Sequence, residues 1–305
     1  MNQSVIQLRK LLFGNCVVAL DTNVLIDLED EKEPTWFRNF VKMRDAGVRF
    51  SIPDLCVGER LDRFEKAESK YIEKMKVEWC RMVSRLDSII WHDLPCLPLR
   101  GDLYDLVGIQ ERGKERVRVQ PFSVERAKEL YRFLCGYVNS PYNRKEQRHP
   151  CIVEFKKVRH EWKTWILDWR ERSSGKSVKE MYDDHMSELK SIFTAPVDIL
   201  SLFELPVRFA AERAHNSRYL PTDDDDCCHQ GGKVKPSNDG LDYAILFLTM
   251  ASINICSFDK LFKEVGCMKR IHRSCCCHKP GAIYDEWHSG KLPCVVLPQV
   301  TDEQD

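Results

Sequence analysis

The 305-residue sequence has no uninterrupted apolar run of the roughly 18 residues that a membrane-spanning helix needs. Its first 15 residues also lack the continuous apolar stretch of a secretion signal, and we therefore expect a cytoplasmic protein with no membrane partner. Net charge is absent as well, because 47 Lys and Arg balance 47 Asp and Glu. Without a general basic field, a nucleic-acid partner would have to bind a local patch.

Cysteine is abundant, with 14 residues, but no Cys-x-x-Cys pair occurs. In a reducing compartment we expect buried, free thiols and no disulfides. Two clusters place cysteines side by side next to a histidine, which is a poor match to the ligand spacing of structural zinc sites. A zinc site that draws on both clusters is the alternative to free thiols. Its ligands would be Cys227, His229, Cys275 and His278.

The order of the hydrophobic segments predicts an α/β fold. Hydrophobic residues make up 43% of the chain, which is enough for a sizeable core. Several short segments are rich in apolar and β-branched residues, and helical patterns separate them. This alternation predicts a central parallel sheet flanked by helices. The predicted strands are residues 16–20, 48–52, 198–202, 253–257 and 294–297.

Asp21 directly follows the first predicted strand, in the sequence CVVALDTNVLIDL at residues 16–28. Asp, Thr and Asn at this place can cap the first turn of the next helix, which is one interpretation. The functional crevice of a parallel sheet, however, lies outside the carboxyl ends of its strands. Three more acids are expected after a strand or in the first turns of a helix, namely Glu59, Asp242 and Asp259. Four carboxylates at one edge of a sheet favour a functional site.

Carboxylates that crowd one site repel each other, so a cation has to compensate their charge. Mg²⁺ and Mn²⁺ prefer oxygen ligands, and one or two of these ions are the expected cofactors. With a substrate phosphate completing the metal shell, such ions promote the hydrolysis of phosphodiester bonds. Asp239 precedes Asp242 in the sequence NDGLD, and either could be a ligand. We favour Asp242, with Asp239 as a helix cap or an auxiliary ligand.

Four segments resemble the PIN-domain nucleases in their order and local context. They are ALDTNVLID, IPDLCVGERL, LDYAILFLTMASINICSFDKLF and the closing CVVLP. The resemblance covers residues 15–65 and 197–300 and implies a Rossmann-like fold of three layers. The catalytic, metal-binding residues that it implies are Asp21, Glu59, Asp242 and Asp259.

The same resemblance implies an endonuclease that leaves a 5′-phosphate and a 3′-hydroxyl, with single-stranded or structured RNA as the expected partner. It also implies that Asn23 and Ser257 bind substrate, and Ser257 could instead orient the acids. Two alternatives remain open at this point. One is a scaffold that keeps the fold and binds RNA or protein without catalysis, and the other is a structure-specific DNA nuclease.

About 130 residues separate the two parts that carry the resemblance. We predict a nuclease core formed by residues 1–64 and 197–305, and a mainly helical insertion at residues 65–196. The insertion would form a lid or a substrate-guiding arm, or would only thicken the core.

A basic segment lies within the predicted insertion. Residues 144–179 contain 11 Lys or Arg and 5 acids, a local excess of +6. The three tryptophans of this segment share one helical face and are expected to pack into the core. The lysines largely off that face are the expected contacts to substrate phosphates. They are Lys156, Lys157 and Lys163.

Overall fold

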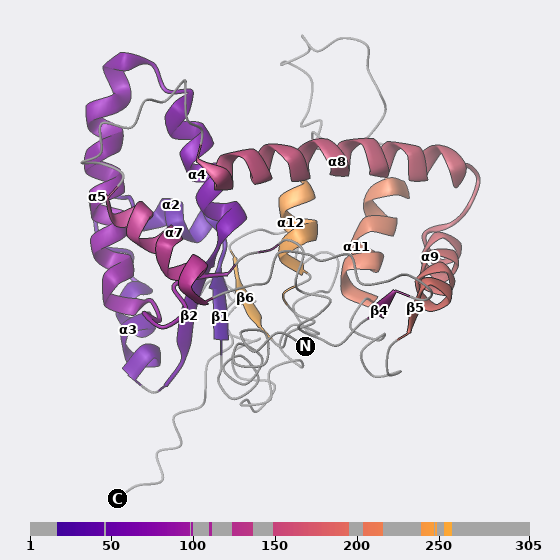
Figure 1. Ribbon diagram of the computed structural model, residues 1–305, viewed down its shortest axis with the longest axis horizontal. Helices are drawn as coiled ribbons and strands as arrows, with labels where there is room; N and C mark the ends of the chain where they lie inside the picture. The colour runs from indigo at the N-terminus through magenta and orange to yellow at the C-terminus, as the bar shows by residue number, and fades with distance from the viewer. Residues whose placement is uncertain are drawn as a thin grey trace, which may run out of the picture.

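A four-stranded sheet forms the centre of the protein, and every pairing between its neighbouring strands is parallel (Figure 1). The strand order is β3-β2-β1-β6. The strands are β1 (Val17–Leu20), β2 (Arg49–Pro53), β3 (Cys96–Leu97) and β6 (Asn254–Cys256). This computed structural model describes residues 17–45, 47–97, 99, 110–111, 124–136, 149–194, 204–215, 239–246, 248 and 253–257.

The parallel sheet and its helices confirm the predicted α/β class. Three predicted strands are present as β1, β2 and β6, whereas those at residues 198–202 and 294–297 lie outside the described residues. The sequence did not predict β3, which pairs Cys96 with Ile52 of β2. Since β3 lies between residues 65 and 196, the predicted insertion contributes one short strand to the sheet.

The central strand β1 is buried on both faces, and none of its four side chains is exposed. A continuous apolar run is typical of a strand that helices cover on both sides. Within β1, Val18 pairs with Phe50 of β2 on one side and with Asn254 of β6 on the other. The strand order therefore changes direction at β1, and in parallel sheets such a switch point is where ligand sites form.

Helices account for most of the remaining described chain. Between residues 54 and 89 the chain forms two helices joined by a short 3-10 turn. A short antiparallel pair, β4 (Gln110–Glu111) and β5 (Phe193–Thr194), lies apart from the main sheet. The helices are α2 (Thr22–Asp27), α3 (Phe37–Asp45), α4 (Asp54–Glu65), α5 (Ile72–Ile89), α7 (Val124–Gly136), α8 (Pro150–Arg172), α9 (Val178–Ile192), α11 (Glu204–His215) and α12 (Asp239–Leu246).

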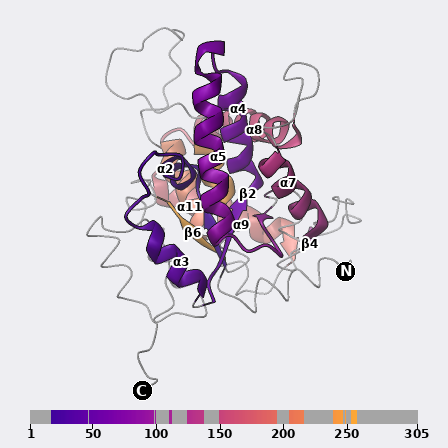
Figure 2. The same cartoon turned by 90° about the vertical axis from the view of Figure 1, so that its left-hand side faces the viewer.

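Helix α8 has 23 residues and extends across α4, α12 and α11 (Figure 1). In Figure 2, where α5 faces the viewer, α8 recedes behind α4. His149 caps the helix, since its Nδ1 accepts a hydrogen bond from the Cys151 amide at 3.3 Å. Trp162 and Trp169 are buried and Trp165 is partly buried, which confirms that the tryptophans pack into the core. The buried residues of α8 and of the sheet form one continuous core.

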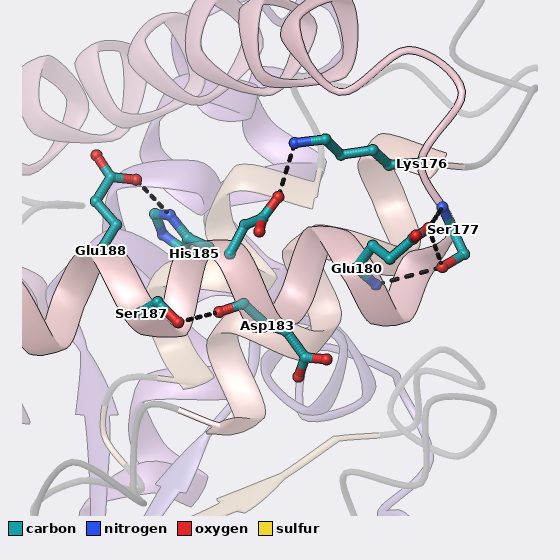
Figure 3. Close-up of polar contacts among 8 residues, drawn as sticks. Lys176, Ser177, Glu180, Asp183, His185, Ser187 and Glu188 are labelled. Atoms are coloured by element: carbon teal, nitrogen blue, oxygen red, sulfur yellow. Dashed lines mark hydrogen bonds and ion pairs between the residues drawn. The ribbon is translucent and has the colours of Figure 1, made fainter.

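The turn from α8 to α9 is fixed by polar contacts (Figure 3). Gly175 has a φ of 82°, a left-handed conformation that glycine adopts without strain. A capping box then begins α9, because the Ser177 amide donates to Glu180 Oε2 at 2.8 Å and the Glu180 amide donates to Ser177 Oγ at 3.3 Å. Lys176 Nζ lies 2.7 Å from Asp184 Oδ2, and this ion pair links the connection between the two helices to the second turn of α9.

The six cysteines that the structure describes are free thiols, as expected. Four of them are buried, but the expected burial is wrong for Cys80 and Cys135, which are exposed. The Cys and His residues of the alternative zinc site lie outside the described residues. None of the helices in the described ranges combines the length and the apolar composition of a membrane span.

Candidate functional site

Asp21 lies at the switch point of the sheet, immediately after β1. Its amide donates to the carbonyl of Cys256 in β6 at 3.0 Å, so the backbone fixes it between the two strands. The carboxylate is buried and caps α2, with Oδ1 accepting from the Thr22 amide at 2.7 Å. The capping interpretation is thus correct for one carboxylate oxygen. The other oxygen, Oδ2, has a different set of partners.

Asn23 and Ser257 both donate to Asp21 Oδ2. The amide nitrogen of Asn23 lies 2.9 Å from this oxygen and the hydroxyl of Ser257 lies 2.6 Å from it. The same Asn23 nitrogen also donates to Ser257 Oγ at 2.8 Å. Asp21, Asn23 and Ser257 are therefore all hydrogen-bonded to one another, although Asn23 and Ser257 are 234 positions apart in the sequence. Because Ser257 is only 1% exposed and donates its proton to Asp21, its position fits orientation of the acid better than contact with substrate.

Glu59 lies in α4, the helix that follows β2, and is partly exposed. One turn before it, the buried Cys56 thiol lies 4.0 Å from Asp21 Oδ1. Burial raises the pKa of Cys56 well above its ordinary value, and the negative charges of Asp21 and Glu59 raise it further. Asp21, which follows β1, and Glu59, in α4, therefore both raise the pKa of the same thiol. Sequence reasoning missed Cys56, although its spacing of three residues from Glu59 puts both on one helical face.

Two neighbouring polar residues of α4 serve the fold. Asp54 is buried, and its Oδ1 accepts from the Leu99 amide at 3.1 Å, which ties the start of α4 to the chain beyond β3. Arg60 follows Glu59 but turns away to pair with the buried Glu29, with Nε 2.9 Å from Oε1. The guanidinium therefore does not neutralise the site acids.

Asp239 and Asp242 both lie in the first turn of α12, the helix that precedes β6. Asp239 is buried, and its Oδ2 lies 3.2 Å from Nε of Arg213 in α11. Asp242 is partly exposed. Since Asp239 is held in an ion pair between helices, the geometry favours Asp242 as the ligand and Asp239 as the anchor of the helix. Sequence reasoning missed Arg213.

The fourth predicted acid, Asp259, lies outside the described residues. Within the described parts of the chain, no three His, Cys, Asp or Glu side chains are already gathered as a metal-binding group. The chemistry of the predicted ligands nevertheless fits a hard cation, because Asp21, Glu59 and Asp242 offer carboxylate oxygens, and oxygen ligands suit Mg²⁺ or Mn²⁺.

The predicted phosphate-binding lysines of α8 have different surroundings. Lys156 Nζ lies 2.8 Å from Asp62 Oδ1 and 3.5 Å from Glu65 Oε2, so it joins α8 to α4. Lys157 is exposed and 4.0 Å from Glu161. Lys163 is exposed. Contact of these lysines with substrate stays a prediction, and Lys156 would have to leave its ion pairs to make it.

Comparison of the chain with protein-family models, with curated proteins and with solved structures finds no match. The resemblance of its motifs to the PIN-domain nucleases stays a prediction.

Proposed function

We propose that this protein is a metal-dependent endonuclease of the PIN type, with a Rossmann-like core of three layers, and that it hydrolyses phosphodiester bonds in RNA. One observation carries the proposal: Asp21 is buried at the switch point of a parallel sheet, and Asn23 and Ser257 hold its Oδ2. A cap needs only one carboxylate oxygen. The elaborate restraint of the second oxygen is expected of a ligand that must keep one orientation.

The residues have separate tasks in this proposal. Asp21, Glu59, Asp242 and Asp259 would hold one or two Mg²⁺ or Mn²⁺ ions, which when bound acidify a water and stabilise negative charge on the scissile phosphate. Asn23 and Ser257 fix the rotamer of Asp21 through their hydrogen bonds. RNA as the substrate follows from the motif resemblance.

Cleavage assays on the purified protein test the proposal. Single-stranded RNA and DNA of one sequence, labelled at the 5′ end, are incubated with Mn²⁺ or with EDTA. We expect RNA cleavage that EDTA abolishes and that Asp21→Asn and Asp242→Asn each reduce at least a hundredfold. Asp45→Asn is the matched control, because Asp45 is an exposed aspartate at the end of α3.

Each other outcome has a defined meaning. Cleavage of DNA in preference to RNA would favour a structure-specific DNA nuclease. RNA binding without cleavage, at any Mn²⁺ concentration, would favour a non-catalytic scaffold. Cleavage by Asp21→Asn at the wild-type rate would remove the site from the mechanism.

A further inference from the structure

We propose that α8 is a brace that positions two of the candidate ligands, Glu59 and Asp242. It would do so by holding the second turn of α4 and the first turn of α12 at a fixed separation. The inference rests on the proposed function, because it assigns positioning roles around the same acids. Two glycines, Gly58 and Gly240, are its main support.

Gly58 lies directly before Glu59, where α4 meets the start of α8. A Cβ atom on Gly58 would lie 2.2 Å from the carbonyl oxygen of Cys151 and 2.7 Å from its carbonyl carbon. Both distances are far below any van der Waals contact, and both partner atoms are backbone, which side-chain rotation cannot move. The absence of a side chain at position 58 is therefore what lets α8 lie against the turn that carries Glu59.

Gly240 lies in the first turn of α12, two residues before Asp242. A Cβ atom there would lie 2.8 Å from Cβ and 3.0 Å from Cγ of Trp162 in α8. Trp162 cannot move aside, since it is buried and its ring lies 4.6 Å from the Tyr243 ring and 6.2 Å from the Phe209 ring, between centroids. The second close contact thus joins α8 to the turn that carries Asp242.

The two contacts lie on one helix, so α8 sets the distance between them. Phe155 Cβ would be 3.0 Å from the missing Cβ of Gly58, and Trp162 follows it by seven residues. Seven residues are two helical turns, about 10 Å along the axis. A helix with a buried apolar face is a stiff spacer, and ligands that share an ion must be held to a fraction of an ångström.

Ion pairs also attach α4 and α12 to neighbouring helices. Lys156 of α8 pairs with Asp62 and Glu65, one to two turns beyond Gly58 in α4. Asp239 of α12 pairs with Arg213 of α11, which itself packs against α8. In α4 the ion pairs lie one to two turns beyond Gly58 and so fix the direction of the helix as well as its position. In α12 Asp239 adjoins Gly240, and its ion pair reinforces the attachment of the first turn.

A third helical glycine lacks such a contact. At Gly136, the last residue of α7, the described residues place nothing outside the neighbouring backbone within 4 Å of the added Cβ position. Glycine weakens a helix interior relative to alanine, so a glycine inside α4 needs a reason. Its close contact with α8 beside a candidate ligand supplies one.

The test compares Gly58→Ala and Gly240→Ala with the matched control Gly136→Ala. Mn²⁺ affinity is measured by calorimetry, and kcat and KM by RNA cleavage, at a temperature where circular dichroism shows each variant folded. We expect the first two variants to lose at least tenfold in Mn²⁺ affinity and in kcat, with KM changed less than twofold. The control should match the wild type. Hydrogen exchange should be faster in the second turn of α4 in Gly58→Ala and in the second turn of α12 in Gly240→Ala, where the amides are hydrogen-bonded within the helix, and unchanged in the control.

Milder variants keep the proposal testable if the glycine variants do not fold. Lys156→Met and Arg213→Met each remove one attachment without adding a steric clash, and we expect about threefold to tenfold weaker Mn²⁺ binding. Lys156→Arg and Arg213→Lys should restore it. Wild-type Mn²⁺ affinity and kcat in every folded variant would overturn the brace and leave the proposed function intact. A wild-type protein that binds no Mn²⁺ would overturn both, and the two failures are thus distinguishable.

Discussion

Asp21→Asn should uncouple the stability of the protein from Mn²⁺. The substitution keeps the shape of the side chain but replaces one carboxylate oxygen with an NH₂ group. In the native site, Oδ1 faces the Thr22 amide and Oδ2 faces donors from Asn23 and Ser257. Either orientation of the new amide therefore points one donor at another.

The expected cost without metal follows from these contacts. Loss of a hydrogen bond to a charged, buried acceptor destabilises a protein by about 1.5–3 kcal/mol. Relief of the repulsion between Asp21 and Glu59 offsets part of this loss. We therefore expect the metal-free variant to be less stable than the wild type by about 1–2 kcal/mol. Repulsion alone would predict the opposite sign.

Saturating Mn²⁺ should increase the difference in stability between the wild type and Asp21→Asn. At a free Mn²⁺ concentration of 100 times Kd, binding to the folded state stabilises the wild type by about 2.7 kcal/mol, whereas a variant that no longer binds gains nothing. Urea denaturation followed by tryptophan fluorescence, with and without Mn²⁺, measures both the loss of stability without metal and the stabilisation by Mn²⁺. Asp45→Asn should behave as the wild type. Equal stabilisation of Asp21→Asn and the wild type by Mn²⁺ would refute the reasoning.

Three further predictions concern single side chains. Burial lowers the pKa of His149 to about 4 from an ordinary 6.5, so its contribution to stability is present above pH 6.5 and is lost as the pH falls toward 4. Urea denaturation across this range should show that His149→Asn, which can still cap α8, has a flatter profile. Ser257→Ala should weaken Mn²⁺ binding by about tenfold to a hundredfold in calorimetry, and unchanged affinity would contradict the role of its hydroxyl on Asp21. Because its pKa is raised, Cys56 should resist iodoacetamide at pH 8 in the native protein while exposed Cys80 reacts, as peptide mass spectrometry can show.

The strands β1, β2 and β6 could be predicted because each contains apolar residues in a short segment and is followed directly by a polar residue, Asp21, Asp54 or Ser257. Helices α4 and α5 could be predicted because few helix breakers occur between residues 54 and 86. The strand β3 could not be predicted from the sequence. It has two residues, Cys96 and Leu97, in a stretch interrupted by prolines, and only its pairing with β2 makes it a strand. A segment this short has no periodicity of its own.

Some features of the candidate site can likewise be predicted from the local sequence, whereas others depend on residues that are distant in the sequence. The place of Asp21 after a strand is a local signal, and the sequence therefore predicts it. The ion pair between Asp239 and Arg213 joins residues from separate helices, and no local pattern announces the partner. Gly58 and Gly240 are intermediate cases. A glycine inside a predicted helix is visible in the sequence, but what it contacts is not.

The basic segment shows why a count of charges does not define a binding surface. Burial alone would raise the pKa of Asp62, but the hydrogen bonds from Lys156 and Lys66 lower it, so both lysines stabilise an ionised carboxylate at the α4–α8 contact. Part of the local excess of +6 is thus used to hold α8 in place. A substrate phosphate would meet the charge that remains exposed, as at Lys157 and Lys163. If α8 is the brace of the metal site, its charges act on catalysis through the position of α4 more than through attraction of RNA.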